Sequence, residues 1–99
     1  IISQVIRHIN PMRAKRTDIN QKDIVHALRT FGATVVDLSS VGKGCPDLLV
    51  GFSNKTYLIE VKRDSKAKFT PQQLQFNELW QGGIIARIET IDDAIALLG

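Results

Sequence analysis

The sequence is poor in the residues that build disulfides and zinc sites. It contains one cysteine, Cys45, and two histidines in 99 residues. A single thiol excludes an intrachain disulfide and a four-cysteine zinc cluster, and with two histidines it also excludes a zinc finger of two cysteines and two histidines. This cysteine usage fits a reducing compartment best, so we expect a cytoplasmic protein.

Long apolar runs are missing as well. No stretch approaches the roughly 20 apolar residues that a membrane span needs, and no basic, apolar and small-residue order marks a signal peptide. We therefore expect no membrane partner. Of the 99 residues, 43% are hydrophobic, which is enough for one core but too few for two ordinary domains.

Charge of one sign is concentrated in two places although the net charge is only +3. The first sixteen residues contain basic side chains and no acid, and a second basic cluster follows at 62–68. Either cluster alone is equally consistent with a solvated face, whereas two clusters in a nearly neutral chain favour a polyanionic partner. The candidate contacts are Arg13, Lys15, Arg16, Lys43, Arg63, Lys66 and Lys68.

Apolar periodicity divides the chain into an N-terminal part, residues 1–16, and a main domain, residues 17–99. Isoleucines at helical spacing before Pro11 predict a short helix, and a basic arm follows it. Asp18 as N-cap and Gln21 three residues later then predict a helix that ends at Gly32.

The rest of the domain alternates between strands and helices. We expect strands at 34–38, 47–52, 56–62 and 84–88, a helix from Thr70 to Trp80, and a last helix capped by Thr90. This order predicts an α/β fold with a mixed central sheet and helices on both of its faces. Phe76 and Trp80 share a helical face and are expected in the core, with base stacking as a lesser alternative. The Gly42-Lys43-Gly44 segment is expected to be a flexible loop, and a phosphate cradle is the weaker interpretation.

The predicted hairpin brings Asp47 close to Glu60 and Lys62. Glu60 and Lys62 share one face of their strand, and Val61 faces the core. Mg²⁺ prefers oxygen ligands and is commonly held by one or two carboxylates, so Asp47, Glu60 and the Val61 backbone carbonyl form a candidate metal site. The alternative is an ordinary ion pair on a sheet edge, with Asp47 closing a turn.

Three segments together resemble the PD-(D/E)XK nuclease superfamily, specifically its small virus-type replication-repair nuclease domains. They are Gly44-Cys45-Pro46-Asp47, then Glu60-Val61-Lys62, then Thr70-Pro71-Gln72-Gln73. The resemblance implies a restriction-endonuclease-like fold, a Mg²⁺ or Mn²⁺ cofactor with no small-molecule cofactor, and cleavage of DNA. It also implies a homodimer and, for some members, a preference for four-way junctions.

The same resemblance assigns roles to residues. Asp47 and Glu60 would bind the metal, Lys62 would be the catalytic lysine, and Gln73 would line the site or instead act only as the capping partner of Thr70. The family usually has a glutamate where this chain has Gln21. A catalytically silent DNA-binding module that kept the fold is therefore the alternative function.

The Gln21 substitution gives a test of its own. If Gln21 stands near the metal, the Gln21→Glu variant should bind Mg²⁺ or Mn²⁺ more tightly, because a carboxylate replaces a neutral amide. Isothermal titration of both proteins with each metal measures this difference. Equal affinities would place Gln21 away from the metal.

Overall fold

The computed structural model describes residues 21–99. The predicted N-terminal helix, the basic arm with Arg13, Lys15 and Arg16, and the predicted cap at Asp18 lie outside the described residues. The elements are α2 (Gln21–Thr30), β1 (Thr34–Asp37), β2 (Leu48–Phe52), β3 (Lys55–Val61), α3 (Pro71–Leu79), β4 (Ile85–Ile88) and α4 (Ile91–Leu98). Within residues 21–99, no helix has the length and apolar character needed to cross a membrane.

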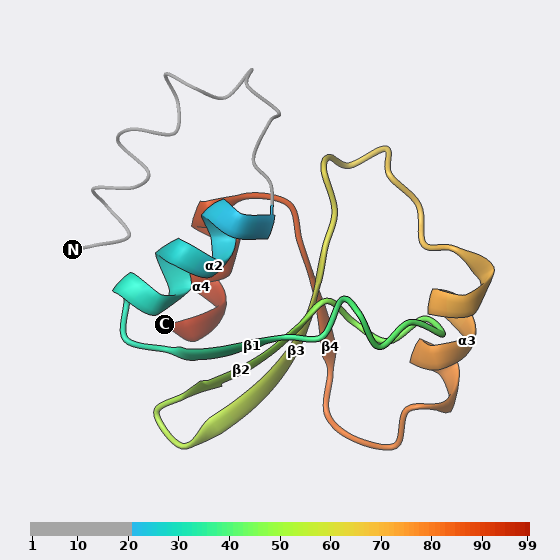
Figure 1. The fold of residues 1–99 in the computed structure, drawn as a ribbon, viewed down its shortest axis with the longest axis horizontal. Helices are drawn as coiled ribbons and strands as arrows, with labels where there is room; N and C mark the ends of the chain where they lie inside the picture. Colours follow the sequence, from blue (N-terminus) through green and yellow to red (C-terminus); the bar gives the residue numbers. More distant parts are fainter. Residues whose placement is uncertain (1–20) are drawn as a thin grey trace.

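The four strands form one mixed sheet in the order β1-β2-β3-β4 (Figure 1). β1 with β2 and β2 with β3 are antiparallel, and β3 with β4 is parallel because α3 carries the chain back between them. This confirms the predicted α/β class and the mixed sheet.

A two-residue turn fixes the register of the hairpin. Ser53 and Asn54 have φ values of 53° and 66°, as a type I′ turn requires, and Phe52 pairs with Lys55. Leu48 therefore lies opposite Ile59. Asp47, one residue before Leu48, consequently reaches the end of β3.

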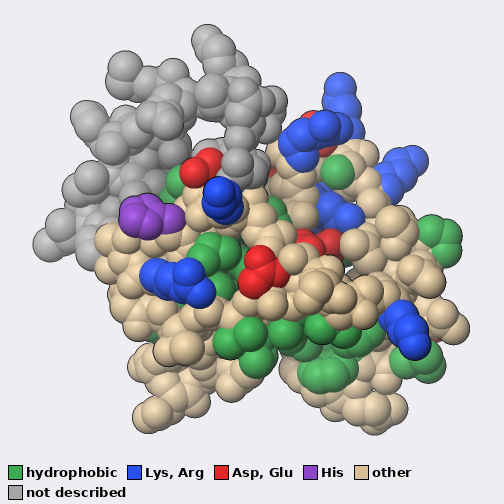
Figure 2. Space-filling view, viewed as in Figure 1, with side chains coloured by type: hydrophobic (Ala, Val, Ile, Leu, Met, Phe, Trp, Pro, Cys, Tyr) green, Lys and Arg blue, Asp and Glu red, His purple; other side chains and the backbone are tan. Residues whose placement is uncertain are grey.

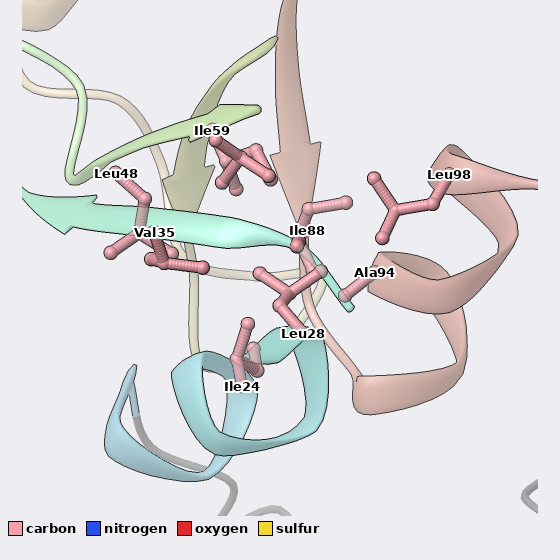
Figure 3. Close-up of a cluster of buried hydrophobic side chains, with 10 residues drawn as sticks. Ile24, Leu28, Val35, Leu48, Ile59, Ile88, Ala94 and Leu98 are labelled. Carbon is pink, nitrogen blue, oxygen red and sulfur yellow. The ribbon is translucent and has the colours of Figure 1, made fainter. Parts of the chain in front are cut away.

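The core lies on one face of the sheet (Figure 3). Helices α2 and α4 pack against each other and cover this face together. Each presents a narrow apolar stripe to the alternate, inward-facing residues of the strands. The contributing side chains are Ile24 and Leu28 of α2, Ala33 just after it, Ala94 and Leu98 of α4, and Val35, Leu48, Val50, Ile59 and Ile88 of the strands.

The prediction of helices on both faces holds only in part, because α3 does not form a packed layer on the sheet. This helix has no buried residue, and it lies apart from α2 and α4 beyond the strands (Figure 1). Phe76 and Trp80 are consequently not core residues, since Phe76 is half-buried and Trp80 is 43% exposed. The physical reason is that α3 is mostly polar and carries no apolar stripe wide enough to bind a sheet face.

Candidate active site

Backbone pairing holds Asp47 at the junction of three strands. Its carbonyl accepts a hydrogen bond from the Leu38 amide at 2.7 Å, just beyond β1. Its Oδ2 accepts one from the Val61 amide of β3 at 2.8 Å. A strand residue directs its N–H and C=O to the same neighbour, so the Val61 carbonyl also faces the side of Asp47.

Glu60 is the one buried charged residue among those the structure describes, at 4% exposure. It lies on the sheet face opposite the core, because its neighbour Ile59 points into the core. The structure therefore brings Asp47 and Glu60 together as predicted from the hairpin, on the face that α2 and α4 leave uncovered.

Gln73 connects α3 to this pair. Its Nε2 donates to Glu60 Oε2 at 2.7 Å, and its Oε1 accepts from Lys62 Nζ at 2.8 Å. The same Oε1 accepts from the Thr70 amide at 2.9 Å, and the Gln73 amide donates to Thr70 Oγ1 at 3.1 Å. The two roles considered for Gln73 are thus compatible, because one side chain caps α3 and also orients the carboxylate and the lysine.

Lys62 completes the cluster. Its Nζ lies 3.5 Å from Glu60 Oε2, and its side chain is only 11% exposed. The ammonium also stands 5.2 Å from the centroid of the Phe69 ring, a distance suited to a cation–π contact. Lys62 is therefore held by three neighbours rather than free in solvent.

The electrostatics of the pair fit a bound cation. Burial raises the pKa of Glu60 most, the negative charge of Asp47 adds to this rise, and Lys62 opposes it, so that the resulting pKa is about 7. A hydrogen bond between the two carboxyl groups also favours the protonated form. A buried carboxyl group that favours its protonated form beside a second carboxylate marks a place where a divalent cation can replace the proton.

This shift predicts how the stability of the metal-free protein depends on pH. The ordinary pKa of Glu60 is 4.5, so the folded protein holds this proton more tightly than the unfolded chain between about pH 4.5 and pH 7. Stability should fall as the pH rises through that window, and Glu60→Gln should reduce the fall. Thermal unfolding in EDTA at several pH values compares the two proteins. An equal fall in both would show that Glu60 does not carry the effect.

The structure places Gln21 elsewhere. Its Nε2 donates to Asp37 Oδ2 at 3.0 Å rather than to the pair. Asp37 lies opposite Leu48, whose side chain is in the core, so by strand alternation Asp37 faces the side of α2. Two hydrogen bonds from Ser39 lower the pKa of Asp37. The metal role of Gln21 stays a prediction.

Sequence reasoning missed Phe69 and Arg87. Arg87 of β4 is the residue opposite Glu60 in the pairing of β3 with β4. Its Cζ lies 5.6 Å from the centroid of the same Phe69 ring that Lys62 approaches. Its guanidinium also donates to the Asp64 carbonyl at 2.8 Å and to Glu89 at 3.1 Å. The signal available in the sequence was a single charge inside the otherwise apolar segment 84–88.

The described basic candidates outside the cluster are exposed. Lys and Arg side chains gather around the segment between β3 and α3 (Figure 2). The Arg63 side chain is 76% exposed and lies 3.7 Å from Asp64, while Lys66, Lys68 and Lys43 are also exposed. Exposure suits contact with a polyanion, although it equally describes a solvated face.

Cys45 is a half-buried free cysteine close enough to Glu60 and Asp47 to feel their charges. Burial, together with the negative charges of Glu60 and Asp47, raises the pKa of its thiol. The thiolate form of Cys45 is thus disfavoured.

The fold and the cluster define a small mixed α/β protein with a paired-carboxylate and lysine site. Comparisons with family models, with curated proteins and with solved structures gave no match. Within residues 21–99, no group of three or more His, Cys, Asp or Glu side chains forms a metal-binding cluster. The resemblance to the nuclease superfamily therefore stays a prediction, and the function is argued from the cluster itself.

Proposed function

We propose that the protein is a divalent-metal-dependent DNA endonuclease that hydrolyses phosphodiester bonds. The observation that supports this most is the buried Glu60, which lies beside Asp47. Glu60 accepts a hydrogen bond from Gln73 and forms an ion pair with Lys62. A structural role does not require a carboxylate with a raised pKa beside a second carboxylate and a lysine.

Each residue has a defined task in this proposal. Asp47, Glu60 and the Val61 carbonyl would hold Mg²⁺ or Mn²⁺, which when bound activates water and offsets charge on the phosphate. Lys62 places a fixed positive charge beside the scissile phosphate, and Gln73 keeps Lys62 and Glu60 in position. The exposed basic side chains between β3 and α3 would contact neighbouring phosphates.

The experiment that tests the proposal is a cleavage panel. Duplex, forked, flapped and four-way-junction DNA are incubated with the protein and Mg²⁺ or Mn²⁺, beside the Asp47→Ala variant and a reaction in EDTA. We expect metal-dependent cutting by the parent only, and the panel shows which DNA structure is preferred. No cutting of any DNA by the parent would contradict the proposal.

The alternative is a catalytically silent DNA-binding module. It is favoured by the small number of acidic groups at the cluster, since no group of three His, Cys, Asp or Glu side chains forms within residues 21–99 and Gln21 is bonded to Asp37 instead. DNA binding in EDTA without cutting after metal is added would support this alternative.

A homodimer is the second partner that we propose. Exposed apolar side chains, among them Val36 at 46% and Ile84 at 90%, offer surface for a second copy. Sedimentation equilibrium over a range of protein concentrations measures the oligomeric state directly. A monomer at every concentration would contradict the proposed dimer.

A further inference from the structure

A hollow of about 210 Å³ lies between α3 and the loop that precedes β2. The side of the molecule that carries α3 shows hydrophobic side chains with basic ones close by (Figure 2). One face of α3 supplies most of the lining and the loop supplies a single lysine. The described lining residues are Lys43, Gln72, Gln75, Phe76, Leu79 and Trp80.

Two aromatic rings form a ready-made platform in this hollow. The rings of Phe76 and Trp80 are stacked, with centroids 5.6 Å apart and an interplanar angle of 16°. The chain at Gly82 passes so close to the indole that a Cβ there would stand 2.6 Å from a ring atom. Trp80 is thus held by Phe76 and by Gly82, yet it remains 43% exposed.

The lysine is held in an unusual backbone conformation. Lys43 has φ 57° and lies between Gly42 at 76° and Gly44 at 81°, so three successive residues are left-handed. A non-glycine residue in this region is strained and is retained where the surroundings fix it. Here the close approach of Gly44 to the Gln72 carbonyl fixes the loop against α3. None of the six described lining residues is acidic.

We propose that this hollow binds one unpaired nucleobase of a DNA strand. The aromatic pair offers a stacking surface, the two glutamine amides can meet the polar edge of a base, and Lys43 complements the adjoining phosphate. The volume is below the roughly 300–1,000 Å³ of sites for drug-sized ligands and suits a single planar ring system.

The position of the hollow relates it to cleavage. Gln73 reaches the Glu60 and Lys62 pair from the same turn of α3 that supplies Gln72 to the hollow. A base held there would leave its strand beside the two carboxylates. The inference rests on the proposed nuclease function and adds to it a substrate class, namely DNA with an unpaired base next to the cut, as at forks and flaps.

Trp80 is the single tryptophan of the chain, so its emission reports on the hollow directly. The full chain is titrated in EDTA with a short oligothymidylate and, in parallel, with an abasic oligonucleotide of the same length. We expect quenching by the first and little by the second, because stacking requires a base. The Phe76→Ala variant should bind oligothymidylate about tenfold more weakly, the size of one lost base–aromatic stack. The Lys43→Ala variant should lower the logarithmic salt slope by about 0.7.

Leu74→Ala is the matched control, since Leu74 is an exposed apolar residue of α3 that does not line the hollow. It should bind as the parent does. Equal affinity for thymidylate and abasic strands, or an unchanged Trp80 emission, would overturn the proposal. So would an emission that changes with protein concentration alone, because a second copy would then cover the hollow.

The two proposals fail separately. Metal-dependent cutting without a Trp80 response would overturn the nucleobase site and leave the nuclease standing. A base-dependent Trp80 response in a protein that cuts no DNA with either metal would overturn the nuclease and leave the nucleobase site standing.

Discussion

Replacement of Asp47 by asparagine should reduce metal-dependent DNA cleavage by about a thousandfold while the protein stays folded. Asparagine keeps the shape and an oxygen that can accept the Val61 amide bond, so the backbone contact at 2.8 Å is preserved. It removes the negative charge that the metal needs. Metal assistance lowers the activation barrier by several kcal/mol, and each 1.36 kcal/mol is a factor of about ten in rate.

The same variant makes a second, independent prediction about Glu60. The charge of Asp47 helps to raise the pKa of Glu60, so in Asp47→Asn that pKa should move back toward its ordinary value. The pH dependence of stability in EDTA should therefore be shallower than in the parent. This readout concerns the metal-free protein and reports whether the two carboxyl groups interact at all.

A matched control separates the loss of the site from a loss of charge. Asp92 lies in the first turn of α4, on the helical layer rather than at the cluster, and Asp92→Asn changes the net charge by the same amount. We expect parental cleavage from it. Cleavage by Asp47→Asn at the parental rate, measured with the DNA that the parent cuts best, would remove Asp47 from the site.

Local signals in the sequence were sufficient for much of the fold. Thr70 with Gln73, and Thr90 with Asp93, form the capping boxes that their spacing predicts. The turn at Ser53 and Asn54 sets the hairpin register, and that register brings Asp47 to Glu60. These features depend on residues close in the chain, or on one tight turn, and so they can be found without knowledge of packing.

Long-range arrangement could not be found in the same way. The spacing of Phe76 and Trp80 correctly places them on one face of α3, but periodicity does not say whether another element covers that face. Arg87 and Phe69 meet Lys62 only because β4 pairs with β3 after a long crossover. The close approach of Gly44 to α3 likewise joins two segments that are distant in the sequence. The residues next to Gly44 in the sequence, Lys43 and Cys45, therefore do not predict this contact.

Because Gly44 packs closely against the first turn of α3, Gly44→Ala is the substitution outside the carboxylate pair with the largest expected effect on cleavage. A Cβ at Gly44 would lie 2.2 Å from the Gln72 carbonyl oxygen and 2.9 Å from the Gln73 amide nitrogen, so the first turn of α3 has to move. Gln73 moves with that turn and loses its bonds to Lys62 and Glu60. We expect cleavage to fall about a hundredfold, since misplacement by about 1 Å has an effect of that size.

Gly42→Ala isolates this packing effect from backbone strain. Gly42 has φ 76°, close to the 81° of Gly44, but no atom lies within 4 Å of a Cβ built there. Both variants should lose about 1–2 kcal/mol of stability from the left-handed conformation, and Gly44→Ala should lose more. Denaturant unfolding measures the difference in stability between the two variants. The rate of DNA cleavage by the folded fraction of each variant measures the difference in activity. If the two variants cut equally well, α3 does not depend on Gly44 for the position of Gln73.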